Sequence, residues 1–109
     1  MKKDTIFASI NKNQKTAISI IRVSGPKTKL IAKKLLKREL NTNVAHLRKI
    51  YSIDNEFIDQ GVAIFFSKPH SSTGEDVLEL HVHGSYAVIT KIEEEFFPLI
   101  AFKKDWRLS

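Results

Sequence analysis

Cysteine is absent from the 109 residues of the chain. Without a thiol, the chain can form no disulfide, no thiolate metal site and no cysteine nucleophile. Long apolar runs are absent as well, since no stretch approaches the roughly 20 apolar residues that span a bilayer. The N-terminal apolar patch is short and is interrupted by Asp4 and Asn11, unlike a secretory signal. These absences predict a cytoplasmic protein that does not enter a membrane.

Length and composition predict one globular domain. A chain of 109 residues is too short for a second domain but long enough to bury a core. Hydrophobic residues make up 42% and charged residues 28%, which is an ordinary globular balance.

The net charge of +6 is divided unevenly along the chain. Residues 1–24 carry five basic and one acidic side chain, residues 25–49 carry eight and one, and residues 50–109 carry five and ten. A basic half can follow a phosphate backbone. Lysines at helix-surface spacing also occur simply as a solvated face, so both interpretations stay open.

Apolar and β-branched segments alternate with polar loops, which predicts several strands. Residues 4–10 and 16–25 are two such segments, and residues 45–53 and 57–66 flank a turn and predict a hairpin. Residues 77–83 are a further strand, and the tail from residue 99 begins another weakly patterned segment.

Two segments show helical patterns. Residues 27–40 follow Gly25-Pro26 and carry an apolar stripe with lysines on the other side; the stripe consists of Leu30, Ile31, Leu35 and Leu36. Residues 86–97 follow Gly84-Ser85 and end before Pro98. Because strands outnumber helices and hairpins join most of them, we expect an α+β domain with a largely antiparallel sheet and two packed helices.

The segment "VLELHVH" places polar side chains at every second position. Period-two geometry sends one set to one side of the sheet, and the set consists of Val77, Glu79, His81 and His83. The alternate residues are Leu78, Leu80 and Val82, which predicts that their side faces the core. A His-x-His pair beside a carboxylate suits zinc, but no third clear ligand is visible. No serine nucleophile motif accompanies these histidines, so we assign neither a metal site nor a catalytic residue.

Glu79 and Arg22 are each charged residues inside an apolar strand pattern. A carboxylate in such a place is costly to bury unless a cation or ligand satisfies it. An arginine there usually pairs with a carboxylate or binds an anion. Either the two residues pair with each other or they bind a ligand, and the residues themselves leave both possibilities open.

Four blocks, in order over residues 4–84, resemble the N-terminal domain of the tRNA modification GTPase family MnmE, also called TrmE. They are "DTIFASI", "ISIIRVSGP", "FIDQGVAIFF" and "STGEDVLELHVHG". The resemblance implies a fold similar to the folate-binding domain of aminomethyltransferases. It also implies binding of 5-formyltetrahydrofolate by Arg22 and Glu79, and a constitutive homodimer.

The family implies further partners. Its members work with a flavin-dependent subunit, MnmG or GidA, on the wobble uridine of tRNA, so we expect contact with tRNA through that complex. The family is a GTP hydrolase, and GTP, magnesium and potassium belong to a GTPase domain that residues 1–109 lack. We therefore expect a single, incomplete domain over residues 1–109 that is not catalytic by itself.

Several positions are assigned by their place in the family pattern. His83 matches a His-Gly pair, and we expect it to help fix the turn from strand to helix. His81 falls where the family varies and receives no role. The loop "NKNQKTA" replaces a glycine-rich loop of the family, and Ser85 replaces a second glycine. Two alternatives to folate binding remain: a ligand-free dimerisation module, and a basic RNA-contact module that uses Lys27 to Lys49.

Overall fold

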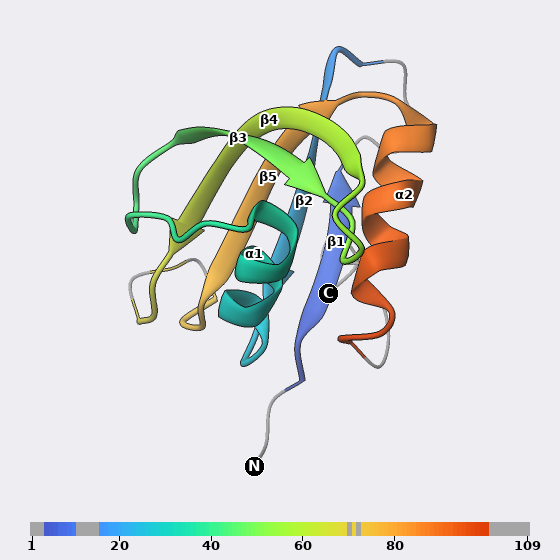
Figure 1. The fold of residues 1–109 in the computed structure, drawn as a ribbon. Coiled ribbons are helices and arrows are strands. Elements are labelled where there is room, and N and C mark those ends of the chain that lie inside the picture. The colour runs from blue at the N-terminus through green and yellow to red at the C-terminus, as the bar shows by residue number, and fades with distance from the viewer. Residues whose placement is uncertain (1–3, 11–15, 70, 72, 101–109) are drawn as a thin grey trace.

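The computed structural model describes residues 4–10, 16–69, 71 and 73–100. Five strands and two helices follow one another along the described chain (Figure 1). In order they are β1 (Ile6–Ile10), β2 (Ile18–Ser24), α1 (Thr28–Leu36), β3 (His46–Tyr51), β4 (Phe57–Phe66), β5 (Val77–His83) and α2 (Tyr86–Phe96).

The strands form one sheet in the order β1-β2-β5-β4-β3. Every neighbouring pair in this sheet is antiparallel. The predicted α+β class and the predicted hairpin between β3 and β4 are therefore confirmed. Strand β5 is the central strand of the sheet. It lies between β2 and β4, although it follows both of them in the sequence.

Both helices pack against the same face of the sheet, which we call the covered face (Figure 1). Phe7, Val23, Leu78 and Phe65 are register partners across four strands, and all are buried there. The helices complete this core with Ile31, Ala32, Leu35, Leu36, Ile89, Ile92 and Phe96. Because side chains alternate along a strand, the residues between them point to the opposite face, which we call the open face.

Helix α1 is shorter than the sequence predicts. It ends at Leu36 because Lys37 adopts a left-handed conformation, with φ at 61°, and its N–H donates to the carbonyl oxygen of Lys33. The prediction of a helix to residue 40 was therefore wrong. Leu30 is 44% exposed and does not belong to the buried stripe, which is a second correction.

Helix α2 begins where the sequence predicts. The side chain of Ser85 accepts a hydrogen bond from the backbone N–H of Val88, which satisfies one of the free donors of the first turn. The loop at residues 11–15 and the tail from residue 101 lie outside the described residues. Leu99 and Ile100 belong to no strand. Among the described helices, none is long and apolar enough to cross a membrane.

Candidate binding site

Arg22 of β2 and Glu79 of β5 stand opposite each other in the sheet. They are direct register partners of the antiparallel pair, so both side chains leave the sheet on the open face. Arg22 Nε donates to Glu79 Oε2 at 2.8 Å. The Glu79 side chain is 14% exposed and the Arg22 side chain 33%. The structure thus brings together the two residues that the sequence singles out, and they form an ion pair.

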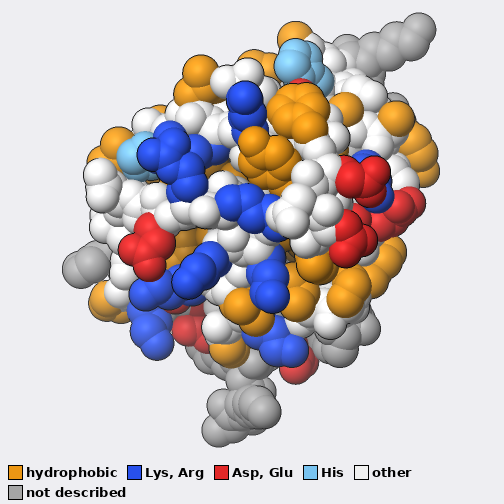
Figure 2. Space-filling view, viewed as in Figure 1, with side chains coloured by type: hydrophobic (Ala, Val, Ile, Leu, Met, Phe, Trp, Pro, Cys, Tyr) orange, Lys and Arg blue, Asp and Glu red, His pale blue; other side chains and the backbone are white. Residues whose placement is uncertain are grey.

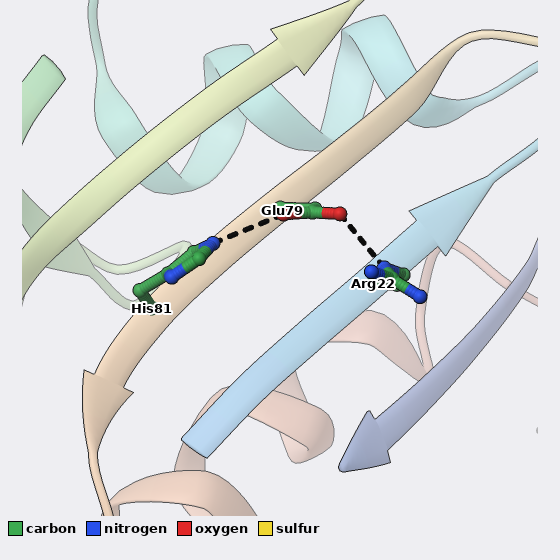
Figure 3. A network of polar contacts seen from close by, with 3 residues as sticks. All are labelled: Arg22, Glu79 and His81. Carbon is green, nitrogen blue, oxygen red and sulfur yellow. Dashed lines mark hydrogen bonds and ion pairs between the residues drawn. The ribbon is translucent and has the colours of Figure 1, made fainter. Parts of the chain in front are cut away.

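His81 completes this polar group, as Figure 3 shows. Its Nε2 lies 3.0 Å from Glu79 Oε1, so each oxygen of the carboxylate has a different partner. We call Arg22, Glu79 and His81 the polar triad. The sequence analysis gave His81 no role, although its place two residues after Glu79 puts both side chains on one face of the strand.

The polar triad is set in an apolar surrounding. The register partners of Arg22 and Glu79 on the outer strands are Ala8 of β1 and Ile64 of β4. The register partners of His81 are Ile20 and Val62. In Figure 3 the ribbons of both helices lie behind the sheet and the triad lies in front of it. The open face therefore presents a small charged centre within an aliphatic surface.

This arrangement can bind a polar molecule. A carboxylate has about four acceptor sites, of which Arg22 and His81 occupy two. The guanidinium uses Nε toward Glu79, and within the described residues its two terminal nitrogens have no partner. Those nitrogens can hold a carboxylate or carbonyl group in paired hydrogen bonds. The triad thus offers acceptors and donors side by side.

His83 lies at the end of β5 and is held by a residue that the sequence analysis missed. Asp59 of β4 accepts a hydrogen bond from the His83 backbone N–H at 3.0 Å, and its other oxygen lies 2.8 Å from His83 Nδ1. The Asp59 side chain is 10% exposed, while that of His83 is 72% exposed. This contact ties the end of β5 to β4.

Gly84 follows His83 where the chain passes very close to its neighbour. A Cβ atom at this position would lie 1.9 Å from the carbonyl oxygen of Thr16, which is far inside van der Waals contact. The Gly84 N–H donates to the carbonyl oxygen of Ala17 at 3.0 Å. Glycine is therefore required at this turn by space rather than by its φ angle.

His81 and His83 do not converge on a metal-binding site. Their side chains have different carboxylate partners, Glu79 and Asp59. In the part of the chain that the structure describes, no group of three or more histidine or acidic side chains is arranged to hold a metal ion.

The amino-acid sequence of the chain matches a known family. The model of the family described as "GTP-binding protein TrmE N-terminus" matches residues 5–107. The chain therefore belongs to the TrmE N-terminal family, and the resemblance predicted from its four sequence blocks is confirmed.

Relatives with the name tRNA modification GTPase MnmE cover most of the chain. That of Anaplasma phagocytophilum is 44% identical over 108 residues, which is 97% of this chain and 24% of the relative. That of Stutzerimonas stutzeri is 45% identical over 80% of this chain and 19% of its own length. That of Hyphomonas neptunium is 48% identical over 80% of this chain and 20% of its own. The chain thus spans about a fifth to a quarter of the length of these relatives.

Proposed function

We propose that this chain is the folate-binding and dimerisation domain of a tRNA modification GTPase that acts on the wobble uridine of tRNA in the cytoplasm. The family membership supports the part of this proposal that names a tRNA modification GTPase. The polar triad supports folate binding, because it supplies charged donors and acceptors on the open face, away from the hydrophobic core. The ligand we propose is 5-formyltetrahydrofolate.

The chemistry of the triad suits a reduced folate. A pterin ring presents an amino group and a ring N–H along one edge, and a carboxylate can accept both. Glu79 would take this edge, and the free nitrogens of Arg22 would take a carbonyl or carboxylate oxygen of the same ligand. The neighbouring Ile20 and Ile64 would pack against its apolar surface. His81 would hold the Glu79 carboxylate in place.

Calorimetric titration with 5-formyltetrahydrofolate tests this site. We expect saturable binding to the wild-type chain and its loss in Arg22→Ala and in Glu79→Gln. The second change keeps the shape of the side chain and removes its charge. Lys49→Ala serves as the control, because Lys49 is an exposed cation of β3 that does not contact the triad. A folded wild-type chain that gives no heat, or variants that bind as well as wild type, would refute a folate site at these residues.

We also propose that the chain forms a homodimer through the aliphatic part of the open face. Ile18 is 57% exposed and Leu47 is 64% exposed. Both lie on the open face, where Ile18 is the register partner of His83 and Leu47 that of Val62. Partly buried aliphatic and aromatic side chains extend the surface; they are Ile6, Ile10, Ile20, Val62, Ile64 and Phe66. An apolar area of this kind on a sheet is typical of a protein interface.

Analytical ultracentrifugation tests the dimer. We expect the wild-type chain to be a dimer and the Ile18→Lys and Leu47→Lys variants to be monomers, because each substitution would place a lysine charge inside the interface. Leu30→Lys is the matched control, since Leu30 is a similarly exposed apolar residue on α1, away from the open face. A monomeric wild-type chain, or a dimer that survives both changes, would contradict the proposal. A dimer without folate binding would favour the ligand-free dimerisation module.

The remaining partners are proposed for the longer protein of which such a domain forms part. We propose that a flavin-dependent MnmG (GidA) subunit acts with it, that tRNA is reached through that complex, and that GTP, magnesium and potassium are bound by a GTPase domain outside these residues. Co-purification of the domain, within its full-length protein, with the flavin-dependent subunit tests the first of these. The absence of any complex under conditions where both proteins are folded would refute it.

A further inference from the structure

The side of the molecule that carries α1 is strongly basic. Figure 2 shows lysine and arginine side chains gathered over α1 and the strand beside it. Five exposed cations of this region have no acidic partner within the described residues; they are Lys27, Lys29, Lys33, Lys34 and Arg38. By contrast, Lys91 on α2 is paired with Glu95 at 3.4 Å. Within the described residues, the basic charge of α1 is thus not neutralised by acidic side chains.

The spacing of these cations works against the helix. Lys29 and Lys33 are four residues apart on α1, so like charges lie next to each other on the helix surface. Such a pair of like charges destabilises a helix. Helix α1 has no acidic residue in its first turn to offset this charge. An anionic partner would remove the repulsion.

A hollow lies beside this row of cations, between α1, the segment that follows it and the end of β4. Its volume is about 230 Å³. Lys29, Lys33 and Arg38 line it together with the apolar side chains of Leu40 and Phe65. It therefore combines positive charge with an apolar wall. The size suits a single small group rather than a drug-sized molecule, which needs about 300–1,000 Å³.

Two carboxylates also line the hollow, those of Glu39 and Asp76. Asp76 Oδ1 accepts a hydrogen bond from the backbone N–H of Lys68 at 3.0 Å, so it is fixed in place. A simple anion such as sulfate gains nothing from such acceptors. A nucleotide does, because its phosphate suits the cations while its base carries amino and N–H donors for the carboxylates.

We propose that this basic surface binds RNA directly, with the backbone along the cations of α1 and one unpaired base in the hollow. The choice of RNA rests on the proposed role in tRNA modification, while the surface itself is defined by the charges and the hollow. It lies on the helix-bearing side of the sheet, opposite the polar triad. RNA can therefore bind while the open face is occupied by folate or by a second copy of the chain.

Fluorescence anisotropy of a labelled tRNA, with the 109-residue chain and without folate, tests this proposal. We compare wild type with Lys29→Gln/Lys33→Gln and with Lys49→Gln/Lys91→Gln, which removes the same charge at sites outside the hollow. Lys49 lies on β3 two residues after Leu47, so its side chain leaves the sheet on the open face and not beside α1. The first double variant should bind about tenfold more weakly at low salt, and its slope of log affinity against log salt should fall by about two between ~50 and ~200 mM salt. The control should bind within about twofold of wild type.

Three results would overturn the proposal. They are no binding of tRNA by the wild-type chain, an equal loss in both double variants, and binding that does not respond to salt. Arg38→Gln, a change outside the helix, provides a second variant, and a thermal melt by circular dichroism shows that each variant is folded. The folate titration is independent of this assay. Folate binding without RNA binding refutes only this inference, and RNA binding without folate binding refutes only the folate site.

Discussion

The two faces of the sheet are built by the same strands but carry different chemistry. On the covered face, Ile21, Leu78 and Leu80 are fully buried under the helices. On the open face, Arg22 and Glu79 form an ion pair among aliphatic neighbours. Alternation along each strand separates the two sets of side chains, so one sequence pattern serves two purposes. The covered face explains why the chain folds, and the open face carries the charged centre that we propose as the folate site.

Truncating a leucine should destabilise the chain more on the covered face than on the open face. Leu80→Ala on the covered face should lower the free energy of unfolding by about 2–5 kcal/mol, because it removes buried contacts and leaves a cavity. Leu47→Ala, the same change on the open face, should lower it by no more than about 0.5 kcal/mol at concentrations where the chain is monomeric, since Leu47 is 64% exposed in the single chain. Urea unfolding of both variants measures the difference. Similar losses in the two variants would show that the faces are not distinct in this way.

Removing a polar contact should also lower the free energy of unfolding more on the covered face than on the open face, but the difference should be smaller. On the covered face, Ser9 Oγ donates to Glu93 Oε2 at 2.5 Å, and Glu93 is 4% exposed. Ser9→Ala removes a hydrogen bond to a buried carboxyl group and should cost roughly 1.5–3 kcal/mol of unfolding free energy.

His81→Ala is the comparison on the open face. His81 also contacts a carboxylate, but its side chain is 28% exposed and water can replace it. We expect a loss of less than about 1 kcal/mol in the same unfolding measurement. If His81→Ala cost as much as Ser9→Ala, the polar triad would be a structural element of the fold.

Sequence reasoning predicted most of the fold because the strands and α2 carry strong local signals. The alternation of Glu79 and His81 with Leu78 and Leu80 indicated both the strand and its buried side. Ser85 indicated the start of α2. The end of α1 was missed because Lys37 gives no sign of a left-handed conformation, and the apolar Leu40 extends the helical pattern beyond the true end.

The candidate site was predictable only in part. Arg22 and Glu79 were each recognised as unusual, and their contact was one of two alternatives that the residues left open. Choosing between them requires the register of β2 on β5, because the two residues are 57 positions apart. The contact of Asp59 with His83 depends in the same way on how β4 lies beside β5. His81 is different, because period-two geometry alone places it next to Glu79.

The smallest expected effect tests the ion pair itself. A double-mutant cycle with wild type, Arg22→Ala, Glu79→Ala and the combined variant gives the interaction energy between the two side chains from four unfolding experiments. We expect about 0.2–1 kcal/mol, because Arg22 is one-third exposed and the solvent weakens the attraction. The value should fall further as salt is added.

A weak coupling would have a clear meaning when set beside the folate titration. If the pair contributes little to stability but its removal abolishes ligand binding, its charges are present for the ligand. Removing one partner of a truly buried pair costs about 3–5 kcal/mol. A loss near that value in Arg22→Ala or Glu79→Ala alone would make the pair a structural contact, and the open face would then need no ligand to explain its charged centre.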